Sequence, residues 1–380
     1  MKIAFICSSL EPGKDGVGDY TRRLAGELLA NGEEISIFAI NDRNVSEMFI
    51  ETQYIDGHVI NVVRMPTILN ARSRFNILKH NLNEFKADLI SLQYVNFGYN
   101  RYGLPFDIIL RLRSAIKNSN LQIMFHELWC GMDKSSGLKE VFLGSLQKLT
   151  IKLTVFVLKP KYINTNIVRY QKRLKQIHVE SVLLPIFSNI STTDYLTDDQ
   201  KKKFYRSKGL TSILEGSENW LVIGFFGSIY RDSGLGKLIE HANAAAIYQN
   251  KRLAIVCIGH NRGTNIEEIA ERFLSTIVFK TGMLSVAEIN AVAQIVDLGI
   301  VTSPADCIDK SGSAIMWLER SIPIAVADSD ITYDELLMKA QGINRISNKT
   351  DVIDIINKDT YYSDGEMRLK KTASFYQRLT

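Results

Sequence analysis

Apolar strand-like runs alternate with helix-period segments along most of the chain, and this alternation is the feature that most limits its fold. Runs that are apolar throughout are typical of parallel strands covered on both faces by helices. Strands of a first series are expected at residues 2–8, 35–40, 59–63, 88–94, 121–126, 162–165 and 182–185, with helices at 19–31, 72–85, 104–117, 138–158 and 167–177. A second series has expected strands at 221–227, 253–259, 277–280, 297–301 and 323–327, and helices at 234–249, 266–274, 286–294, 314–320 and 333–340.

The two series predict two α/β domains. A polar stretch over 188–219 separates them and carries no strand signal before Trp220. We expect two doubly wound, Rossmann-like domains, 1–190 and 200–364, whose strand ends face a central cleft, where ligands of such sheets bind. The last segment, 365–380, has helical character and is a candidate to pack back on the first domain.

Composition excludes several other classes of protein. With 46% hydrophobic and 23% charged residues the chain is neither disordered nor fibrous. Its four cysteines are far apart with no CxxC pair, which argues against a disulfide scaffold or a zinc knuckle. The run 153–158 ends at Lys159 and Pro160, so we expect no segment of the ~20 apolar residues that span a bilayer. Residues 1–6 predict a first strand rather than a signal peptide, which favours a cytoplasmic location.

Charge is unevenly distributed. The segment from Arg64 to Lys175 holds 19 Lys and Arg against 6 Asp and Glu, a net charge of +13 (19 − 6) in a chain of net +5. Such asymmetry indicates an anionic partner, which could be nucleic acid, a membrane surface or a phosphorylated substrate. A solvated basic face is the simpler interpretation.

The first strand leads into a glycine-containing loop, 9–18, before a helix. Glycines there allow backbone N–H groups to approach an anion. A dinucleotide-binding fold is one alternative, since Asp42 closes the second strand where a ribose-binding acid would stand. The loop is too long for that fold, however, and Thr21 replaces the third glycine of GxGxxG. A plain glycine turn is the other alternative.

Polar residues follow two further strands of the first series. His126 and Glu127 come directly after the strand at 121–126, where active-site residues of α/β sheets gather. A structural histidine is the competing interpretation. The strand before it ends in the polar and aromatic run 92–100, which could bind a polyol.

The second series carries two more candidate loops. The run 222–235 again reads strand, glycine loop, helix, with Arg231 in the loop. Lys310 and the turn Ser311-Gly312-Ser313 precede the next helix and predict a phosphate cradle, with a plain serine N-cap as the alternative. Asp328-Ser329-Asp330 resembles a metal-binding DxD, but Asp330 is well placed to cap the following helix, so we predict no metal site. No GxSxG or Walker A pattern is present.

In this order the motifs resemble retaining glycosyltransferases of the GT-B fold, in particular glycosyltransferase family 4. The residues that carry the resemblance are GVGDYTRRLAGEL (16–28), FHE (125–127), FGS (226–228), GLGKLI (234–239), SVAE (285–288), VTSP (301–304) and IPIA (322–325). The resemblance implies transfer of a sugar from a nucleotide donor with retention and without a metal or other cofactor. It also implies that the second domain binds the donor and the first binds the acceptor.

The resemblance, together with the residues that line the loops, leads to the following expected roles. Catalytic roles fall to His126, Arg231 and Lys310. Donor contacts fall to Gly16, Gly18, Gly227, Ser228, Arg231, Leu284, Asp309, Lys310, Ser311, Gly312 and Ser313. Acceptor contacts are expected from Asp19, Tyr20, Gln93, Asn96, Tyr99 and Glu127.

Two departures from the family pattern concern the donor loops. Ser228 and Ser233 stand where the family has Arg and Lys, and Arg231 is expected to replace the charge. The family's paired glutamates fall near Ile308 and Met316, neither of which is acidic. Asp306 or Asp309 could replace the first glutamate, whereas Glu319 is out of register for the second.

The sequence therefore predicts a hexosyltransferase of exopolysaccharide biosynthesis that uses a UDP-sugar, with UDP-glucose favoured. Its expected partners are the nucleotide-sugar donor, a saccharide or lipid-diphosphate acceptor, and the inner face of an anionic membrane as a peripheral contact. A degenerate GT-B protein that binds nucleotide sugars without turnover is the alternative. Nucleic-acid binding is not expected, because no stacking or groove-reading motif accompanies the basic charge.

Overall fold

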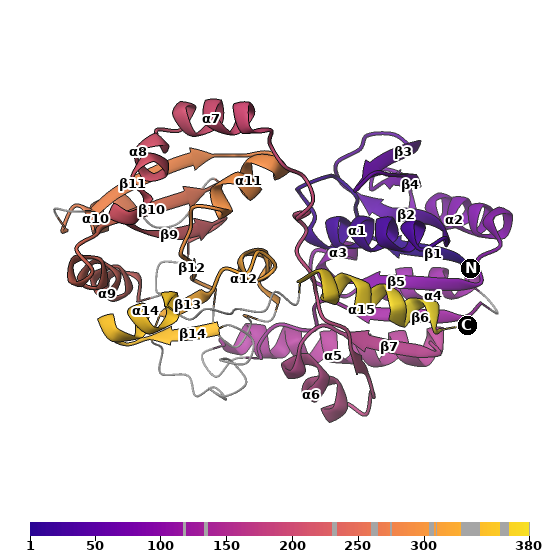
Figure 1. Ribbon diagram of the computed structural model, residues 1–380. Helices are drawn as coiled ribbons and strands as arrows, with labels where there is room; N and C mark the ends of the chain where they lie inside the picture. Colours follow the sequence, from indigo (N-terminus) through magenta and orange to yellow (C-terminus); the bar gives the residue numbers. More distant parts are fainter. Residues whose placement is uncertain are drawn as a thin grey trace. The chain divides into compact units, whose positions relative to one another are not determined.

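The computed structural model describes residues 1–116, 119–132, 136–229, 234–259, 265–273, 276–303, 308, 310–327, 343–357 and 365–379. The chain divides into two compact units, each built on its own sheet (Figure 1). Unit 1 comprises Met1–Asn189 with Met367–Thr380, and unit 2 comprises Ile190–Glu366.

Unit 1 contains an eight-stranded sheet of order β3-β4-β2-β1-β5-β6-β7-β8. Its strands are β1 (Lys2–Cys7), β2 (Glu34–Asp42), β3 (Phe49–Ile55), β4 (His58–Pro66), β5 (Leu89–Tyr94), β6 (Leu121–Phe125), β7 (Tyr162–Thr165) and β8 (Val182–Leu183). Its helices are α1 (Gly16–Ala30), α2 (Ala71–Phe85), α3 (Asn96–Tyr99), α4 (Phe106–Ala115), α5 (Leu138–Leu158), α6 (Val168–Gln176) and α15 (Gly365–Gln377). All strand pairs are parallel except β3 with β4, so the expectation of purely parallel strands is wrong at this edge.

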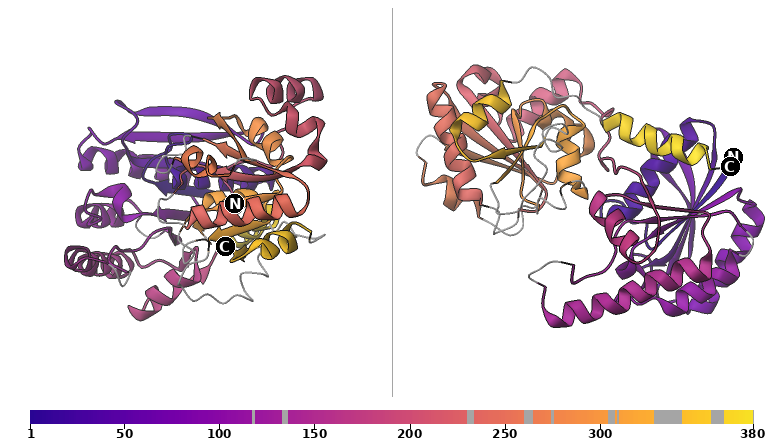
Figure 2. Two further views of the ribbon diagram at one scale, coloured as in Figure 1. Left: turned by 90° about the vertical axis from the view of Figure 1, so that its left-hand side faces the viewer. Right: turned by 90° about the horizontal axis from the view of Figure 1, so that it is seen from below.

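The two faces of this sheet are covered by different helices. Strand alternation sends Ile3 and Phe5 toward α1 and α15, and sends Ala4 and Ile6 toward α2, α4, α5 and α6. Seen from below, α15 (yellow) and α5 (magenta) lie on opposite sides of the sheet (Figure 2, right). The last helix of the chain therefore completes the core of unit 1.

Unit 2 contains a six-stranded sheet of order β11-β10-β9-β12-β13-β14, in which every described pair is parallel. Its strands are β9 (Trp220–Phe226), β10 (Arg252–Ile258), β11 (Thr276–Gly282), β12 (Leu298–Val301), β13 (Ile324–Ala327) and β14 (Ile343–Ile346). Its helices are α7 (Asp198–Ser207), α8 (Thr211–Glu215), the 3₁₀ helix η1 (Ser217–Asn219), α9 (Leu235–Tyr248), α10 (Ile266–Ala270), α11 (Val286–Ala293), α12 (Gly312–Leu318) and α14 (Lys349–Ile356). The predicted helix at 333–340 and the Asp328-Ser329-Asp330 run lie outside the described residues.

Two glycines set the position of α12 on this sheet. Gly224 on β9 and Gly299 on β12 are register partners, and both lie under the fully buried indole of Trp317. A Cβ would stand 2.7 Å from this indole at Gly224 and 2.5 Å from it at Gly299. Only glycine therefore lets α12 approach the sheet here, and this close packing holds the start of α12 near the carboxyl end of β12.

One helix of unit 1 contradicts the expectation that no segment is long enough to span a bilayer. Helix α5 has 21 residues and is long and apolar enough to cross a membrane by length and composition alone, and 33% of its most apolar window is buried. Two lysines, Lys148 and Lys152, lie within this stretch, but the apolar residues around them keep its mean hydropathy at 1.5.

Candidate functional site

The strand order of unit 2 reverses between β9 and β12, and the loops after these strands meet there. Chain connections run from β9 to β10 and β11 on one side, and from β12 to β13 and β14 on the other. Thr302 Oγ1 lies 3.4 Å from the carbonyl oxygen of Ser228, which joins the two loops. Such a reversal is where open parallel sheets hold ligands, beyond the carboxyl ends of the strands.

Three serine hydroxyl groups gather beside this junction. Ser303 Oγ lies 3.0 Å from Ser311 Oγ, which in turn lies 2.9 Å from Ser313 Oγ. Ser311 also caps α12, accepting a hydrogen bond from the amide of Ala314 at 3.4 Å. Three hydroxyl groups carry three protons and their two mutual hydrogen bonds use two, so one proton remains for an acceptor outside the cluster. A phosphate oxygen is an acceptor of this kind.

Glycines end three adjacent strands of the same sheet. Gly227, Gly259 and Gly282 follow or end β9, β10 and β11 with φ angles of +79°, +94° and +69°. The amide of Gly227 donates to Ile258, and that of Gly259 donates to Gly282, both at 2.9 Å. Positive φ favours glycine at each position. Because glycine has no side chain, a ligand can approach the backbone at these three strand ends.

The predicted donor residues of unit 2 fall unevenly around this edge. Lys310 is half-buried and directly precedes the serine cluster, while Gly312 and Ser228 are exposed. Leu284 lies in the loop between β11 and α11 and packs against the core with its side chain. Arg231, Ser233, Asp306 and Asp309 lie outside the described residues. These assignments stay predictions.

The structure also locates the positions of the family's paired acids. Ile308 and Met316 are buried in the core of unit 2. Glu319 follows the last residue of α12, whereas the serine cluster stands at the first turn, so Glu319 does not join the cluster. Ser303, although part of the VTSP motif, and Gly259 were not predicted as site residues. Gly259 directly follows β10 and Ser303 lies two residues after β12, and closeness to a strand end is the signal that could have found them.

In unit 1, His126 follows β6 and is 5% exposed. Its Nε2 lies 2.7 Å from Gln93 Oε1, and its ring stands edge-on to Tyr20 with centroids 4.8 Å apart. Since an amide oxygen only accepts, Nε2 carries the proton and Nδ1 keeps a lone pair. Nδ1 forms no hydrogen bond with any residue that the structure describes. Burial lowers the pKa of His126 to about 3, so the imidazole is neutral at physiological pH.

A buried polar network holds the amide that orients this imidazole. Gln93 Nε2 donates to Ser91 Oγ at 2.6 Å and to the Tyr376 hydroxyl at 3.2 Å. Ser91 and Tyr376 both hydrogen-bond Gln122 Oε1, at 2.6 and 3.1 Å, and Gln122 Nε2 donates to Asn164 Oδ1 at 2.9 Å. All five side chains are at most 1% exposed. The network crosses β5, β6 and β7 and is closed by α15.

Several residues of the expected acceptor set have partners inside unit 1. Gln93 is an internal partner of the imidazole rather than an exposed ligand. Asn96 is fully buried and donates to the carbonyl of Leu128 at 2.6 Å, and the Tyr99 hydroxyl donates to the carbonyl of Gln93 at 3.3 Å. Tyr20 is 2% exposed and stacks on Phe187. All four side chains are buried in unit 1, and their roles as acceptor contacts stay predictions.

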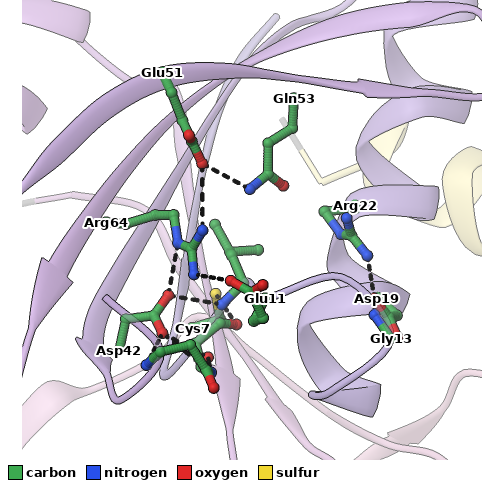
Figure 3. A network of polar contacts seen from close by, with 12 residues as sticks. Cys7, Glu11, Gly13, Asp19, Arg22, Asp42, Glu51, Gln53 and Arg64 are labelled. Carbon is green, nitrogen blue, oxygen red and sulfur yellow. Dashed lines mark hydrogen bonds and ion pairs between the residues drawn. The ribbon is translucent and has the colours of Figure 1, made fainter. Parts of the chain in front are cut away.

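The two remaining acceptor candidates lie at the surface or near it. Glu127 is exposed and stays a prediction. Asp19 is half-buried, forms an ion pair with Arg22 and accepts a hydrogen bond from the amide of Gly13 at 3.1 Å (Figure 3). Asp19 therefore ties the loop before α1 to the helix.

The start of α1 differs from the expected anion site. The Asp15 carboxylate accepts hydrogen bonds from the amides of Val17 at 3.0 Å and Gly18 at 2.9 Å. Burial raises the pKa of Asp15 even though these two amides stabilise its charged form. At Gly18 a Cβ would stand 2.5 Å from the carbonyl oxygen of Ser9, so this glycine permits packing within unit 1. Gly16 is exposed, and a Cβ there would meet only Asn189 Nδ2 at 4.0 Å, so it remains a candidate for donor contact.

The dinucleotide alternative is excluded by the environment of Asp42. This carboxylate is fully buried and accepts from Arg64 Nε at 2.8 Å (Figure 3). Arg64 also reaches Glu11 at 2.6 Å and Glu51 at 3.4 Å. Burial alone would raise the pKa of Asp42, but the hydrogen bonds from Arg64 and from the amides of Asn44 and Leu10 hold it below its ordinary value. Asp42 thus anchors the loop after β1 and cannot receive a ribose.

Part of the basic charge is internal as well. Arg64 is paired with the acids of this network. Arg74 is buried, donates to the carbonyl of Ile40 at 2.7 Å and contacts Asn41. The net charge of +13 therefore overstates what this segment presents to a partner. Across the described part of the chain, no three His, Cys, Asp or Glu side chains group as a metal site would require.

Comparison with solved structures identifies the fold. One similar structure is WaaG, a glycosyltransferase involved in lipopolysaccharide biosynthesis (TM-score 0.52, 11% identity, 98% of this chain and 94% of that one). Another is the catalytic domain of starch synthase IV from Arabidopsis thaliana bound to ADP and acarbose (0.53, 11%, 100% and 98%). The chain has the GT-B fold. The predicted fold class is confirmed.

The same comparison also finds UDP-GlcNAc 2-epimerase from Neisseria meningitidis bound to UDP-GlcNAc (TM-score 0.51, 11% identity, 100% and 99% coverage). This protein is an epimerase by name, so the GT-B fold by itself does not decide between sugar transfer and other chemistry on nucleotide sugars. No protein-family model matches the chain, and no curated protein matches it in sequence.

Proposed function

We propose that the protein is a glycosyltransferase whose unit 2 binds a nucleotide-sugar donor. The observation that carries this proposal is the edge of unit 2 where the hydroxyls of Ser303, Ser311 and Ser313 gather beside the glycine turn at Gly227. Hydroxyl donors and exposed backbone suit a diphosphate. Solved structures of the same fold bound to ADP and to UDP-GlcNAc support it.

The reaction forms one glycosidic bond and breaks another. The acceptor hydroxyl oxygen attacks the anomeric carbon on the face from which the nucleoside diphosphate leaves. The bond between that carbon and the diphosphate oxygen breaks, and the acceptor's proton passes to an oxygen of the leaving diphosphate. The task of the protein is to stabilise growing charge on the diphosphate, for which Lys310 and Arg231 are the proposed cations.

The finer proposal is a retaining, metal-independent hexosyltransferase of family 4 that uses UDP-glucose in exopolysaccharide biosynthesis. The order of its sequence motifs supports this assignment, as does the likeness to WaaG, itself described as acting in lipopolysaccharide biosynthesis. The proposed acceptor is a saccharide or lipid diphosphate, reached from the cytoplasmic side of a membrane.

Calorimetric titration with UDP, GDP and ADP tests donor binding. Ser313→Ala is the sharpest variant, because Ser311 also caps α12 and its loss would confound folding with binding. A hydrogen bond to a charged group contributes about 1.5–3 kcal/mol, so Ser313→Ala is expected to weaken UDP binding by about tenfold or more, and Arg231→Ala similarly. The matched control is Ser217→Ala, which removes an exposed serine preceding β9, at the opposite end of the strand. Equal affinity of Ser313→Ala and the parent protein would remove the serine cluster from the donor site.

His126 supplies a test of transfer rather than of binding. A neutral imidazole whose Nδ1 accepts a sugar hydroxyl stabilises positive charge that develops at the anomeric carbon. His126→Ala is expected to lower kcat about 100-fold and leave UDP affinity unchanged, since unit 2 holds the nucleotide. A folded His126→Ala protein that turns over at the parental rate contradicts this role.

A second candidate function is nucleotide-sugar binding without turnover. It is favoured by Ile308 and Met316, buried apolar residues where the family places two acids. Incubation with each nucleotide sugar and a panel of saccharide and lipid-linked acceptors separates the two. Tight donor binding with neither transfer nor hydrolysis would support the second candidate.

A further inference from the structure

Helix α5 buries several polar side chains and leaves a set of large apolar side chains exposed. Its inward face carries Gln147, Thr150 and Thr154 together with the core residues Ile151 and Leu158, all at most 2% exposed. Its outward face carries Leu138, Phe142, Leu149 and Phe156, exposed to 90%, 69%, 56% and 75% of their surface. A helix on a water-exposed surface normally turns large apolar side chains such as these four inward.

The inward contacts fix the helix in this orientation. Gln147 accepts from the amide of Cys130 at 2.9 Å and donates to the carbonyl of Tyr102 at 2.8 Å. At Gly144 a Cβ would stand 2.1 Å from the carbonyl oxygen of Cys130, so α5 approaches the loop after β6 closely. Rolling the helix to bury its apolar side would leave these buried polar groups unpaired, which costs free energy.

The exposed apolar residues form a single line. They are four, seven and seven residues apart, spacings that return to nearly the same side of a helix. From Leu138 to Phe156 the line is roughly 27 Å long at 1.5 Å per residue. Figure 2 (right) shows α5 running along the outside of unit 1. We call Leu138, Phe142, Leu149 and Phe156 the α5 stripe.

Positive charge borders the α5 stripe. Residues 138–161 contain five lysines, at 139, 148, 152, 159 and 161, and one acid, Glu140. Helical periodicity places Lys148 and Lys152 along one edge of the stripe, and Lys159 directly follows the end of the helix. An apolar line beside a row of lysines complements a surface that is apolar inside and anionic at its boundary.

We propose that the α5 stripe inserts into the boundary region of an anionic lipid bilayer, with the helix lying along the membrane. It does not span the bilayer, because its opposite side is hydrogen-bonded to the rest of unit 1. This inference deepens the part of the proposed function that places the acceptor at a membrane, and vesicle binding tests it without donor or turnover. Absence of vesicle binding by the parent protein, with intact UDP binding, would contradict this inference and leave the donor site standing.

The test is flotation of the full-length protein with vesicles of phosphatidylcholine alone or mixed with phosphatidylglycerol. Phe142→Gln/Phe156→Gln is expected to lower partition about 100-fold, because each removes a large apolar side chain from the lipid. Lys148→Gln/Lys152→Gln is expected to lower it about 30-fold on anionic vesicles only, and less at high salt. All four positions are exposed or half-buried, so the fold is retained.

The matched control is Ile50→Gln/Tyr54→Gln on β3. These side chains are 70% and 74% exposed on the same unit, and acidic residues, Glu47, Glu51 and Asp56, surround them in sequence. The control is expected to bind vesicles like the parent protein. The proposal is overturned by absence of vesicle binding, or by equal loss in the control. It is also overturned if sedimentation shows that the parent protein is a dimer and that the Phe142→Gln/Phe156→Gln variant is a monomer, since the stripe would then join two copies of this chain.

Discussion

The buried imidazole of His126 should make the stability of unit 1 fall as the pH is lowered below about 6.5. An unfolded histidine has a pKa near 6.5, and burial lowers the pKa of His126 to about 3 in the folded protein. Above the unfolded pKa both states are neutral and nothing is lost. Below this pKa the unfolded state binds a proton that the folded state does not bind. Protonation therefore stabilises the unfolded state relative to the folded one. The loss is about 1.4 kcal/mol per pH unit, or about 2 kcal/mol between pH 7.5 and 5.0.

The perturbation that isolates this effect is His126→Gln, which cannot titrate but keeps an N–H donor for Gln93 Oε1. Amide hydrogen exchange of β5 and β6, corrected for the intrinsic pH dependence, reports the local free energy of opening at both pH values. Other groups, such as Asp15 with its raised pKa, are present in both proteins and cancel in the comparison. The parent protein should lose about 2 kcal/mol more than the variant between the two pH values. Identical pH dependence in both proteins would refute the burial of the imidazole.

Three further outcomes follow from packing, ion pairing and donor chemistry. Gly299→Ala should destabilise unit 2 by about 1–3 kcal/mol in urea unfolding, because the new Cβ meets the buried indole of Trp317. The control Gly236→Ala, whose Cβ meets open space in α9, should leave stability unchanged or raise it. Arg64→Met should destabilise unit 1 by about 3–5 kcal/mol by leaving the buried Asp42 carboxylate unpaired, and adding Asp42→Leu should restore much of that loss. EDTA should leave sugar transfer unchanged, and a strict requirement for a divalent cation would contradict the metal-independent mechanism.

Continuous apolar strands made most of both sheets predictable, whereas strands of mixed character were missed. β3 has the sequence FIETQYI, is half-exposed, and pairs with β4 across the turn at Asp56 and Gly57. The Asp-Gly turn and the alternation of side chains are the hairpin signals that could have found it. Helix α7 was not predicted because it lies in a polar stretch. Thr197 and Gln200 form the capping box at its start and are the signal that could have found it.

The candidate site divides in the same way. Ser311 and Ser313 are neighbours in the chain, so a local motif predicts them together. Ser303 joins them only because α12 packs over the glycines of β9 and β12, which brings its first turn beside the loop after β12. Gln93 lies two residues after Ser91 on β5, and both face α15, which the sequence supplies far later. A polar residue at a strand end does not reveal which face it takes, because the helix that covers that face is encoded elsewhere.

The return of α15 to unit 1 has a consequence for synthesis on the ribosome. The strands of unit 1 are made first, but Tyr376, which closes the polar network over β5 and β6, is made only after the whole of unit 2. Until then the amides of Gln93 and Gln122 face water, and the apolar residues around them lack their cover. A chain that stops anywhere within unit 2 keeps this surface open, where proteases and chaperones recognise incomplete proteins. The first unit of the molecule is therefore finished last.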